Sequence, residues 1–363
     1  MLAEVRRIAE GPLAGLADDI DRRGIYPKAV LVALGEAGAY RALLSGPAGP
    51  DYASAIQAIT EVSRVCGATG FMVWCQMVCG LYMEQSANPH LTGETLEAHV
   101  DGSTLGGTGM SNPMKTFAGI ETLLLKARPT PEGYIVNGAL PWVSNLGPKH
   151  YFGAVAQVET PAGEPAREIM FIVRCDGQGV DLRSCPSFSA MEGTTPWSVR
   201  LTDAFIGADA MVADPVRPFI GRIRAAFVLL QVGMGLGVAQ GAIDSMRDVE
   251  RQLGHVNQFL EDRPDDLQCE LDALQARTLD LAQTPYAPQQ DYLIDVLDVR
   301  AHASELSLRA AQSALLHAGA RGYLMTSPVQ RRVRESHFVA IVTPAIKHLR
   351  KEIARLSAPE MPA

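Results

Sequence analysis

The sequence lacks the features that mark several large classes of protein. Of its 363 residues, 32 are basic and 40 are acidic, which gives a net charge of −8, and it has no lysine- or arginine-rich cluster. A protein that binds a nucleic-acid backbone needs such a cluster to neutralise phosphates, so we expect no nucleic-acid partner. Residues 1–21 mix acids and bases and contain no apolar core, so we expect no secretory signal.

Cysteine is also scarce. The six cysteines show no spacing typical of a disulfide framework, and a chain of this length needs no cross-links to build a core. We therefore expect a reduced, cytoplasmic protein. Cys75 and Cys79 lie four residues apart, but no second cysteine or histidine pair accompanies them, and the eight histidines are scattered. Structural zinc requires four ligands in short pairs, so we expect no metal.

Charged residues are missing from two stretches, 65–83 and 225–243, that approach the length of a membrane span. Each stretch contains several glycines and at least one glutamine. Helices that are apolar on all sides also fill the centre of large helical bundles, where small residues let neighbouring helices approach closely. We expect buried helices here and no membrane partner.

Apolar periodicity divides the chain into three parts. Residues 1–103 place apolar side chains at three- and four-residue steps, which predicts a helical domain. Residues 104–216 contain short runs rich in β-branched and aromatic residues, which predicts an antiparallel β-domain. The helical period returns over residues 217–363. The predicted fold class is α+β and mainly helical, with strands at 122–127, 134–137, 152–158, 169–174 and 198–201 and a hairpin turn at 129–133.

Several short motifs occur in an informative order. Their positions are 108–113 (TGMSNP), 132–138 (EGYIVNG), 139–145 (ALPWVSN), 317–323 (HAGARGY) and 328–335 (PVQRRVRE). From residue 21 to residue 356 the chain resembles the acyl-CoA dehydrogenase family of flavoproteins. That family has a T-E-P segment, a hairpin ending in W-i-T/S-N, a G-G-x-G-y helix end and a P-v-E/Q-R-x-x-R-D helix start. The hairpin and the C-terminal motifs are the specific ones.

The resemblance implies a fold that agrees with the order of elements predicted from periodicity. It comprises an N-terminal helical domain, a central β-domain and a C-terminal four-helix bundle, assembled as a homodimer or homotetramer. The resemblance also implies a flavin, FAD or alternatively FMN, between the β-domain and the bundle. By the same resemblance, the main chain of Met110 and the hydroxyl of Ser111 face the pyrimidine ring of the flavin. Trp142 covers the dimethylbenzene side, and Ser144 bonds near N5.

Three further residues are assigned to the cofactor by resemblance. Thr108 and Gly319 lie in the matched motifs, and Arg251 corresponds to an arginine that meets the pyrophosphate across the dimer. The match is imperfect, because the arginine motif is one residue short and lacks its aromatic residue. The family's A-G-S-D segment is replaced by residues 114–117, and two other cofactor contacts by Leu316 and Ala345.

The most consequential departure concerns the catalytic base. In ordinary family members a glutamate removes the substrate α-proton, which requires close contact with that hydrogen. The family position falls on Thr343, and the alternative family position falls near Phe227; neither residue is acidic. We expect the reaction to involve Thr343 and a nearby histidine, His348, with His337 and His150 as further candidates.

Three functions are compatible with these residues. The first is a flavin-dependent oxidoreductase that acts on a C–H donor such as an acyl-CoA thioester, with a non-standard or absent catalytic base and an electron-transfer partner. The second is a two-component flavin monooxygenase of the same fold, supplied by a flavin reductase. Enzymes of the second kind need a dry pocket with a hydrogen bond near N5 rather than a glutamate. The third is a non-catalytic paralogue. The missing glutamate weighs against the first, and the Trp142–Ser144 hairpin weighs against the third.

Overall fold

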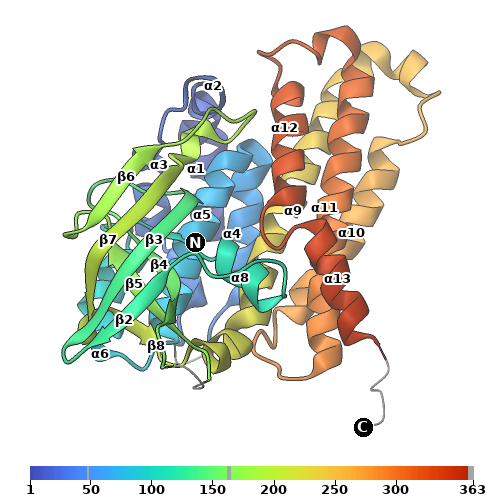
Figure 1. The fold of residues 1–363 in the computed structure, drawn as a ribbon. Helices are drawn as coiled ribbons and strands as arrows, with labels where there is room; N and C mark the ends of the chain where they lie inside the picture. The colour runs from blue at the N-terminus through green and yellow to red at the C-terminus, as the bar shows by residue number, and fades with distance from the viewer. Residues whose placement is uncertain (47–48, 162–164, 359–363) are drawn as a thin grey trace.

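Helices form both ends of the chain and a sheet lies between them in the sequence (Figure 1). The computed structural model describes residues 1–46, 49–161 and 165–358. The N-terminal helices include α4, which begins at the Asp51 cap, and α5, in which every residue except Glu84 is buried. Their bounds are α1 Leu2–Ile8, α2 Ala14–Arg23, α3 Lys28–Glu36, α4 Tyr52–Val65, α5 Gly67–Glu84, α6 Pro89–Thr92 and α7 Glu94–Val100, with a π-helical turn at Ala9–Leu13 and a 3-10 turn at Tyr40–Leu43.

The strands form one sheet in the order β6-β7-β3-β2-β4-β5-β8, and β1 pairs with β4. Their bounds are β1 Gly106–Thr108, β2 Lys126–Thr130, β3 Gly133–Val143, β4 Tyr151–Val158, β5 Arg167–Arg174, β6 Val180–Ser184, β7 Trp197–Gly207 and β8 Met211–Ala213; helix α8, Ser111–Phe117, follows β1. The hairpin turn at 129–133 is confirmed, because Thr130 pairs with Gly133. Buried side chains of β2, β3, β4, β5 and β7 form a separate hydrophobic core of the β-domain.

One predicted strand was wrong in its bounds, and the mainly antiparallel sheet contains two parallel pairings. The strand expected at 122–127 begins only at Lys126, because Asn112 accepts a hydrogen bond from the Leu124 amide and donates one to the Thr122 carbonyl. The sheet is antiparallel except where β4 pairs in parallel with β1 and with β2. The predicted antiparallel β-domain is therefore confirmed, with the two parallel pairings and the unpredicted strands β1, β6 and β8 in addition.

The C-terminal helices form a bundle in which α9 and α11 pack along each other and α10 and α12 pack against both. Their bounds are α9 Val216–Asn257, α10 Pro264–Leu281, α11 Gln290–Ala318, α12 Pro328–Ile341 and α13 Ile346–Leu356. Helix α9 is long and apolar enough to cross a membrane, but 94% of its apolar window is buried inside the protein. It is therefore a core helix, as the glycine content predicted. The division at residues 103 and 216 stays a prediction.

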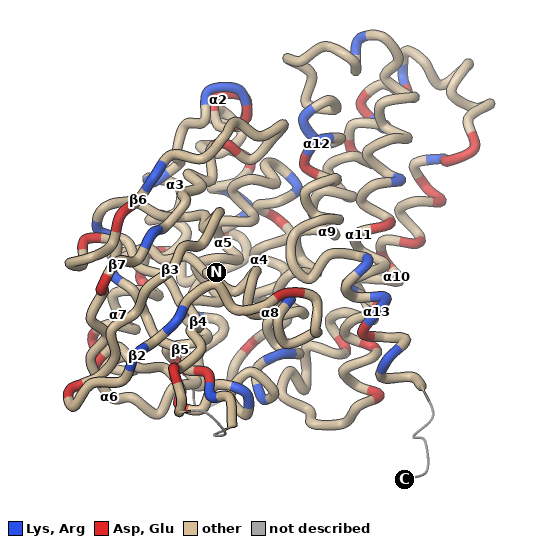
Figure 2. Tube along the Cα trace, in the orientation of Figure 1, with Lys and Arg blue, Asp and Glu red and all other residues tan. Residues whose placement is uncertain are grey.

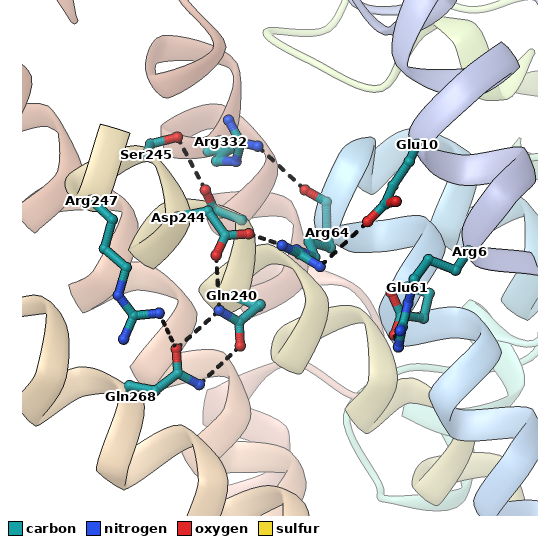
Figure 3. A network of polar contacts seen from close by, with 11 residues as sticks. Arg6, Glu10, Glu61, Arg64, Gln240, Asp244, Ser245, Arg247, Gln268 and Arg332 are labelled. Atoms are coloured by element: carbon teal, nitrogen blue, oxygen red, sulfur yellow. Dashed lines mark hydrogen bonds and ion pairs between the residues drawn. The ribbon is translucent and has the colours of Figure 1, made fainter. Parts of the chain in front are cut away.

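Helix α9 joins the bundle to the N-terminal helices through close packing. An ideal Cβ placed on Gly237 would lie 2.4 Å from the Thr60 carbonyl oxygen and 2.5 Å from the Ser63 Cβ, both on α4. Only glycine permits this approach of the two helices. Polar contacts flank it (Figure 3): Arg64 Nε donates to Asp244 at 2.5 Å, and Gln240 exchanges hydrogen bonds with Gln268 of α10. The two helical regions thus share one continuous core.

A buried polar network attaches the sheet to α5. His99 Nε2 lies 2.7 Å from the Gln76 carbonyl oxygen, so this nitrogen carries the proton and donates it. His99 Nδ1 then accepts from the Tyr151 hydroxyl at 2.7 Å, and Gln76 Oε1 accepts from the Gly106 amide at 2.8 Å. The ring is fully buried, and this burial lowers its pKa from 6.5 to about 4. His99 is therefore neutral in the folded protein near neutral pH.

Lowering the pH from 7 to 5 is expected to reduce the free energy of unfolding by about 2 kcal/mol through His99 alone. Because the folded-state pKa lies below the unfolded value, the unfolded chain binds more protons below pH 6.5. The stabilisation is fully present above that pH and is lost as the pH falls towards 4. Denaturant unfolding at the two pH values measures the loss. The His99→Gln variant cannot ionise and should show a smaller loss; an equal loss would contradict this assignment.

Candidate active site

The two segments predicted to bind the flavin lie side by side. An ideal Cβ on Gly107 would lie 2.3 Å from the Ser144 carbonyl oxygen, so β1 passes directly against the end of the β3 hairpin. Asn145 fixes this contact, because its Nδ2 donates to the Gly106 carbonyl at 2.7 Å. The chain then leads from β1 into α8. The fold therefore brings the segment of residues 108–111 next to the segment of residues 142–144, which are distant in sequence.

The predicted cofactor residues differ in their contacts. The hydroxyl of Thr108 lies 2.7 Å from that of Tyr82, and the hydroxyl of Ser144 lies 3.0 Å from that of Thr194. Met110 is buried at the start of α8. Each hydroxyl has one protein partner and can make another hydrogen bond. Thr108 and Ser144 are thus held in place, and each hydroxyl keeps the capacity for a further hydrogen bond.

Trp142 is the unusual member of the set. The residue is 59% exposed, and its ring meets Phe188 edge-on with the ring centroids 5.8 Å apart. A large aromatic side chain exposed to this extent on a sheet is typical of a surface that a ligand or partner covers. An isoalloxazine ring offers the flat apolar edge that would cover an indole, and the hydroxyls beside it are donors that suit the ring's nitrogens and carbonyls. The residues present therefore fit a flavin.

The bundle reaches this site through Thr343. The Thr343 hydroxyl lies 3.0 Å from the Ser111 hydroxyl, although the two residues are 232 positions apart. Gln231 of α9 donates from Nε2 to the Thr343 carbonyl at 2.9 Å, and its Oε1 accepts from Arg300 Nε at 3.2 Å. Arg300 is fully buried, and this burial lowers its pKa to about 10. A chain of hydrogen bonds thus runs from the core of the bundle to the start of α8.

The second family position for a base is occupied by an aromatic cluster. Phe227 meets the Trp74 ring edge-on at 5.1 Å, and Trp74 stacks on Phe71 at 5.5 Å. Phe71 in turn meets Phe338, which lies on α12 shortly before Thr343, at 4.7 Å. These rings come from α5, α9 and α12, so they line the junction between the helical regions. They supply apolar surface and no proton acceptor.

His348 lies on the other side of Thr343, in the first turn of α13. It is buried, and its Nδ1 has no hydrogen-bond partner among the described residues. Burial is the largest cause that lowers its pKa below the ordinary value. It lines a narrow crevice with Met114, Pro344 and Glu352. A neutral ring with an unpartnered nitrogen can accept a proton, which fits the predicted role.

The other candidate bases are less suitable. His337 is exposed on α12, and its Nδ1 donates to the Val333 carbonyl at 2.6 Å. His150 donates from Nδ1 to the Asn145 carbonyl at 3.0 Å and lies against Tyr26. Both rings have thus used one nitrogen in a local contact. Of the three histidines, His348 alone is more than nine-tenths buried.

Glu335 is the buried carboxylate of α12. Burial raises its pKa, which is a property of many catalytic acids. Its Oε1, however, accepts from the Gly67 amide at 2.9 Å, at the start of α5, and an ideal Cβ on Gly67 would lie 2.9 Å from its Cδ. A carboxylate at a helix N-terminus is stabilised by the free amides there. Glu335 therefore closes the junction between α5 and α12.

Arg251 and Gly319 lie at the far end of the bundle. Figure 1 places the start of α12 at the top of the view, and α8 and α13 lower down. The ends of α9 and α11 meet there, because Asn257 donates to the His317 carbonyl at 3.2 Å. Arg251 is exposed and forms no ion pair within residues 1–46, 49–161 and 165–358. One copy of the chain therefore does not bring these two residues to the Trp142 hairpin.

Sequence patterns missed several residues of this region. Gln231, Arg300, Arg224 and Glu352 all lie around Thr343 and His348. A polar residue inside an uncharged apolar stretch is a usable signal, and Gln231 is such a residue. Arg300 lies within the predicted α11 helix, but no pattern indicates that its guanidinium faces the core.

All six cysteines are free, and the thiols of Cys75 and Cys79 are buried, which raises both pKa values.

Comparison with known proteins gives a consistent result. Residues 1–103 match the family model described as the acyl-CoA dehydrogenase N-terminal domain, and residues 229–343 match the model of its C-terminal domain. A probable acyl-CoA dehydrogenase from Bacillus subtilis, YngJ, is 24% identical over 369 residues, which cover 93% of this chain and 91% of that protein.

Two solved structures illustrate the similarity of fold. Butyryl-CoA dehydrogenase from Megasphaera elsdenii superposes with a TM-score of 0.84 at 18% identity, over 98% of this chain and 96% of that one. Dibenzothiophene monooxygenase, TdsC, from Paenibacillus sp. A11-2 superposes with a TM-score of 0.82 at 16% identity and the same coverage. TdsC has also been solved with FMN and indole. The fold is therefore shared by proteins named for two different reactions.

Proposed function

The chain belongs to the acyl-CoA dehydrogenase family, and from this premise we propose that it is a flavin-dependent oxidoreductase acting on a C–H donor such as an acyl thioester. The contact between Ser111 and Thr343 carries the proposal. It joins the flavin-binding motif of the β-domain to the loop that holds the base in the family, at 3.0 Å. A substrate bound at this junction would meet groups from both parts of the chain.

Residues of this chain would hold the flavin by its ring system. Trp142 would cover its apolar edge, and Ser144 and Ser111 would donate to its polar atoms, with Thr108 and the main chain of Met110 beside them. When bound, the flavin supplies a hydride acceptor at N5. We propose FAD, the cofactor of the family. FMN is the alternative, because TdsC has been solved with it.

His348 would take the proton that the family's glutamate takes. Its ring is neutral because burial lowers its pKa, and the free Nδ1 can accept a proton. Thr343 has no acid–base group and instead holds the loop, through its bonds to Ser111 and Gln231. Because the pKa is lowered, His348 stays unprotonated at a lower pH than an ordinary histidine does. Bases of this kind contribute about 10²–10⁴ in rate.

A two-component monooxygenase is the second candidate. The aromatic cluster of Phe71, Trp74, Phe227 and Phe338 favours it, because stacked rings bind flat aromatic substrates and exclude water. TdsC, which has been solved with indole bound, has the same fold. In this case the partner would be a flavin reductase. For the oxidoreductase, the partner would be an electron acceptor. A similar structure from Acidaminococcus fermentans is described as an electron transferring flavoprotein.

We propose a homodimer or homotetramer in which a second copy completes the flavin site. Arg251 and Gly319 lie far from the Trp142 hairpin within one copy, so they could serve only the site of another. Exposed apolar side chains surround them at the end of the bundle, namely Leu316, Tyr323, Leu324, Met325, Val256 and Phe259. A patch of this kind is typical of a protein interface. Light scattering that reports a single 39.0 kDa species would contradict the proposal.

The visible spectrum of the purified protein, before and after addition of FAD, tests the proposed function. We expect flavin absorbance that stays with the protein on gel filtration. Anaerobic mixing with acyl-CoA thioesters should then bleach that absorbance. Product formation only from reduced flavin and oxygen would favour the monooxygenase instead. A protein that binds neither FAD nor FMN, in oxidised or reduced form, would contradict both and support a non-catalytic role.

A further inference from the structure

A cavity of about 150 Å³ lies beside the candidate active site, between α8, α9 and α13. It is lined by Met114, Phe117, Ala118, Arg217, Ile220, Gly221, Arg224 and Glu352. Cavities of this volume hold a molecule about the size of benzene. Met114 lies one turn of α8 after Ser111, so the cavity opens next to the Ser111–Thr343 contact.

Two arginines of α9 provide the charge of this cavity, and each is paired with a carboxylate. Arg224 Nη2 donates to Glu352 at 2.9 Å, and Arg217 donates to Glu168 at 2.6 and 3.0 Å. In both pairs the carboxylate is the buried member. The side chains of Glu352 and Glu168 are 4% and 7% exposed, whereas those of Arg224 and Arg217 are 20% and 58% exposed. The guanidinium group is thus the more exposed member of each pair, and Arg217, Arg224 and Glu352 all line the cavity.

Around the cavity, basic side chains outnumber acidic ones. Arg355 also binds Glu352, at 3.1 and 3.3 Å, so that carboxylate is shared between two arginines. Lys351 of α13 donates to the Ala118 carbonyl, and Lys115 of α8 pairs with Glu121. Figure 2 shows basic residues gathered along α13 beside α8, in a chain whose net charge is −8. Within the described ranges, Arg224 Nε and Nη1 make no hydrogen bond. The guanidinium group of Arg224 therefore has N–H donors that are free to bind an anion.

The inner end of the cavity gives an independent indication of a ligand. Met114, Arg224 and Glu352 also line the adjoining crevice, which leads to His348 and Pro344. His348 is more than nine-tenths buried, and its Nδ1 lacks a partner in the described part of the chain. An unpartnered buried polar atom is costly, so such atoms are rare in folded proteins. Met114, which lines both the crevice and the cavity, has a flexible side chain that can adapt to a ligand there.

We propose that this cavity binds an anionic group of the substrate, a carboxylate or a phosphate, on Arg224, with the remainder of the substrate directed towards His348. Guanidinium groups bind such anions through paired charge-assisted hydrogen bonds. The site would therefore select substrates that carry such an anionic group over neutral ones. That the anion belongs to the substrate rests on the proposed function, whereas binding of the anion does not.

NMR titration of the full chain, with and without FAD, tests the site with small probes. Butyrate is the carboxylate probe, inorganic phosphate is the phosphate probe, and butyramide is a neutral molecule of the same size as butyrate. We expect saturable, roughly millimolar binding of one anionic probe and at least about tenfold weaker binding of butyramide. Stronger binding of butyrate identifies a carboxylate, and stronger binding of phosphate identifies a phosphate. Equal binding of butyrate and butyramide, with no binding of phosphate, would overturn the proposal.

Arg224→Met is the decisive variant, and Arg222→Met is its control. The first should weaken binding of the anionic probe at least about tenfold, because it removes the free guanidinium donors. Arg355 still pairs with Glu352 in this variant, so the carboxylate keeps a counter-charge. Arg224→Lys keeps the positive charge and serves as the second variant should Arg224→Met not fold. Arg222 is exposed on the same helix, donates to the Gln85 carbonyl and does not line the cavity. Unchanged binding in both Arg224 variants would contradict the site.

The result is separable from that of the proposed function. Anion binding that depends on Arg224, in a protein whose flavin no acyl thioester reduces, would support the site and contradict the reaction. Flavin reduction by acyl thioesters without Arg224-dependent anion binding would support the reaction and contradict the site.

Discussion

Replacing His348 with phenylalanine is expected to slow substrate reduction of the flavin by about 10²–10⁴-fold, the contribution of a general base. The change removes the free Nδ1 that would accept the proton, while a ring of similar shape fills the space. Stopped-flow measurement of flavin bleaching under anaerobic conditions gives the rate directly. The loss should appear in kcat, and flavin content should stay at the level of the parent protein.

The stability of His348→Phe distinguishes a catalytic role from a structural one. The His348 side chain makes no hydrogen bond to any described residue, and its Nδ1 is buried. Removing a buried, unpartnered polar atom is neutral or stabilising. We therefore expect an unchanged or higher free energy of unfolding together with a lower rate. If His348 had a structural role, its replacement would instead lower both the free energy of unfolding and the rate.

His337→Asn is the matched control for this experiment. His337 lies before the Thr343 loop as His348 lies after it, but it is exposed and donates to its own helix. Its replacement should leave flavin reduction close to that of the parent. If His348→Phe reduces its flavin as fast as His337→Asn does, another group accepts the proton. The assignment of the base would then be wrong, while flavin reduction by the substrate would still support the oxidoreductase.

The second large effect concerns stability. Asp21→Asn is expected to lower the free energy of unfolding by about 3 kcal/mol or more, because it leaves the Arg334 guanidinium in a buried site without its counter-charge. Arg334 donates to both oxygens of Asp21, at 2.7 and 2.5 Å, and both side chains are largely buried. This ion pair joins α12 to α2. Urea denaturation at pH 7 measures the difference.

Asp19→Asn, on the same helix, is the control for Asp21→Asn. Asp19 pairs with Arg23 at 3.2 Å on the exposed face of α2, where such pairs contribute roughly 0–1 kcal/mol. A double variant, Asp21→Leu with Arg334→Met, should lose less than the sum of the single changes, since no charge is then left unpaired. Equal losses in Asp19→Asn and Asp21→Asn would show that the Asp21–Arg334 pair is not the junction we describe.

Much of the fold was predictable because its signals are local. The helical period of residues 217–363 corresponds to helices α9 to α13. The runs at 152–158 and 169–174 correspond to β4 and β5. The prediction for 122–127 was wrong because a side chain outside the segment, Asn112, holds the main chain there. β-Propensity reports composition and not this competing contact.

The candidate site divides in the same way. Local motifs indicated Ser111, Trp142 and Ser144, since these residues belong to a hairpin and a helix start with a recognisable order. The distant partners were not predictable, because a helix pattern gives the buried face only approximately. Arg224 and Glu352 are both charged helix residues in the sequence, and no pattern shows that they pair with each other at the wall of a cavity.

The amino-acid sequence alone determined the class of this protein, because the order of helices and strands and the hairpin motif depend on residues close together in the chain. Tertiary structure alone decided which groups meet. The Ser111 hydroxyl contacts that of Thr343, 232 positions away in the sequence, and His348 lines the same crevice as Arg224. Such meetings depend on the rotation and packing of whole helices, and no local pattern specifies either.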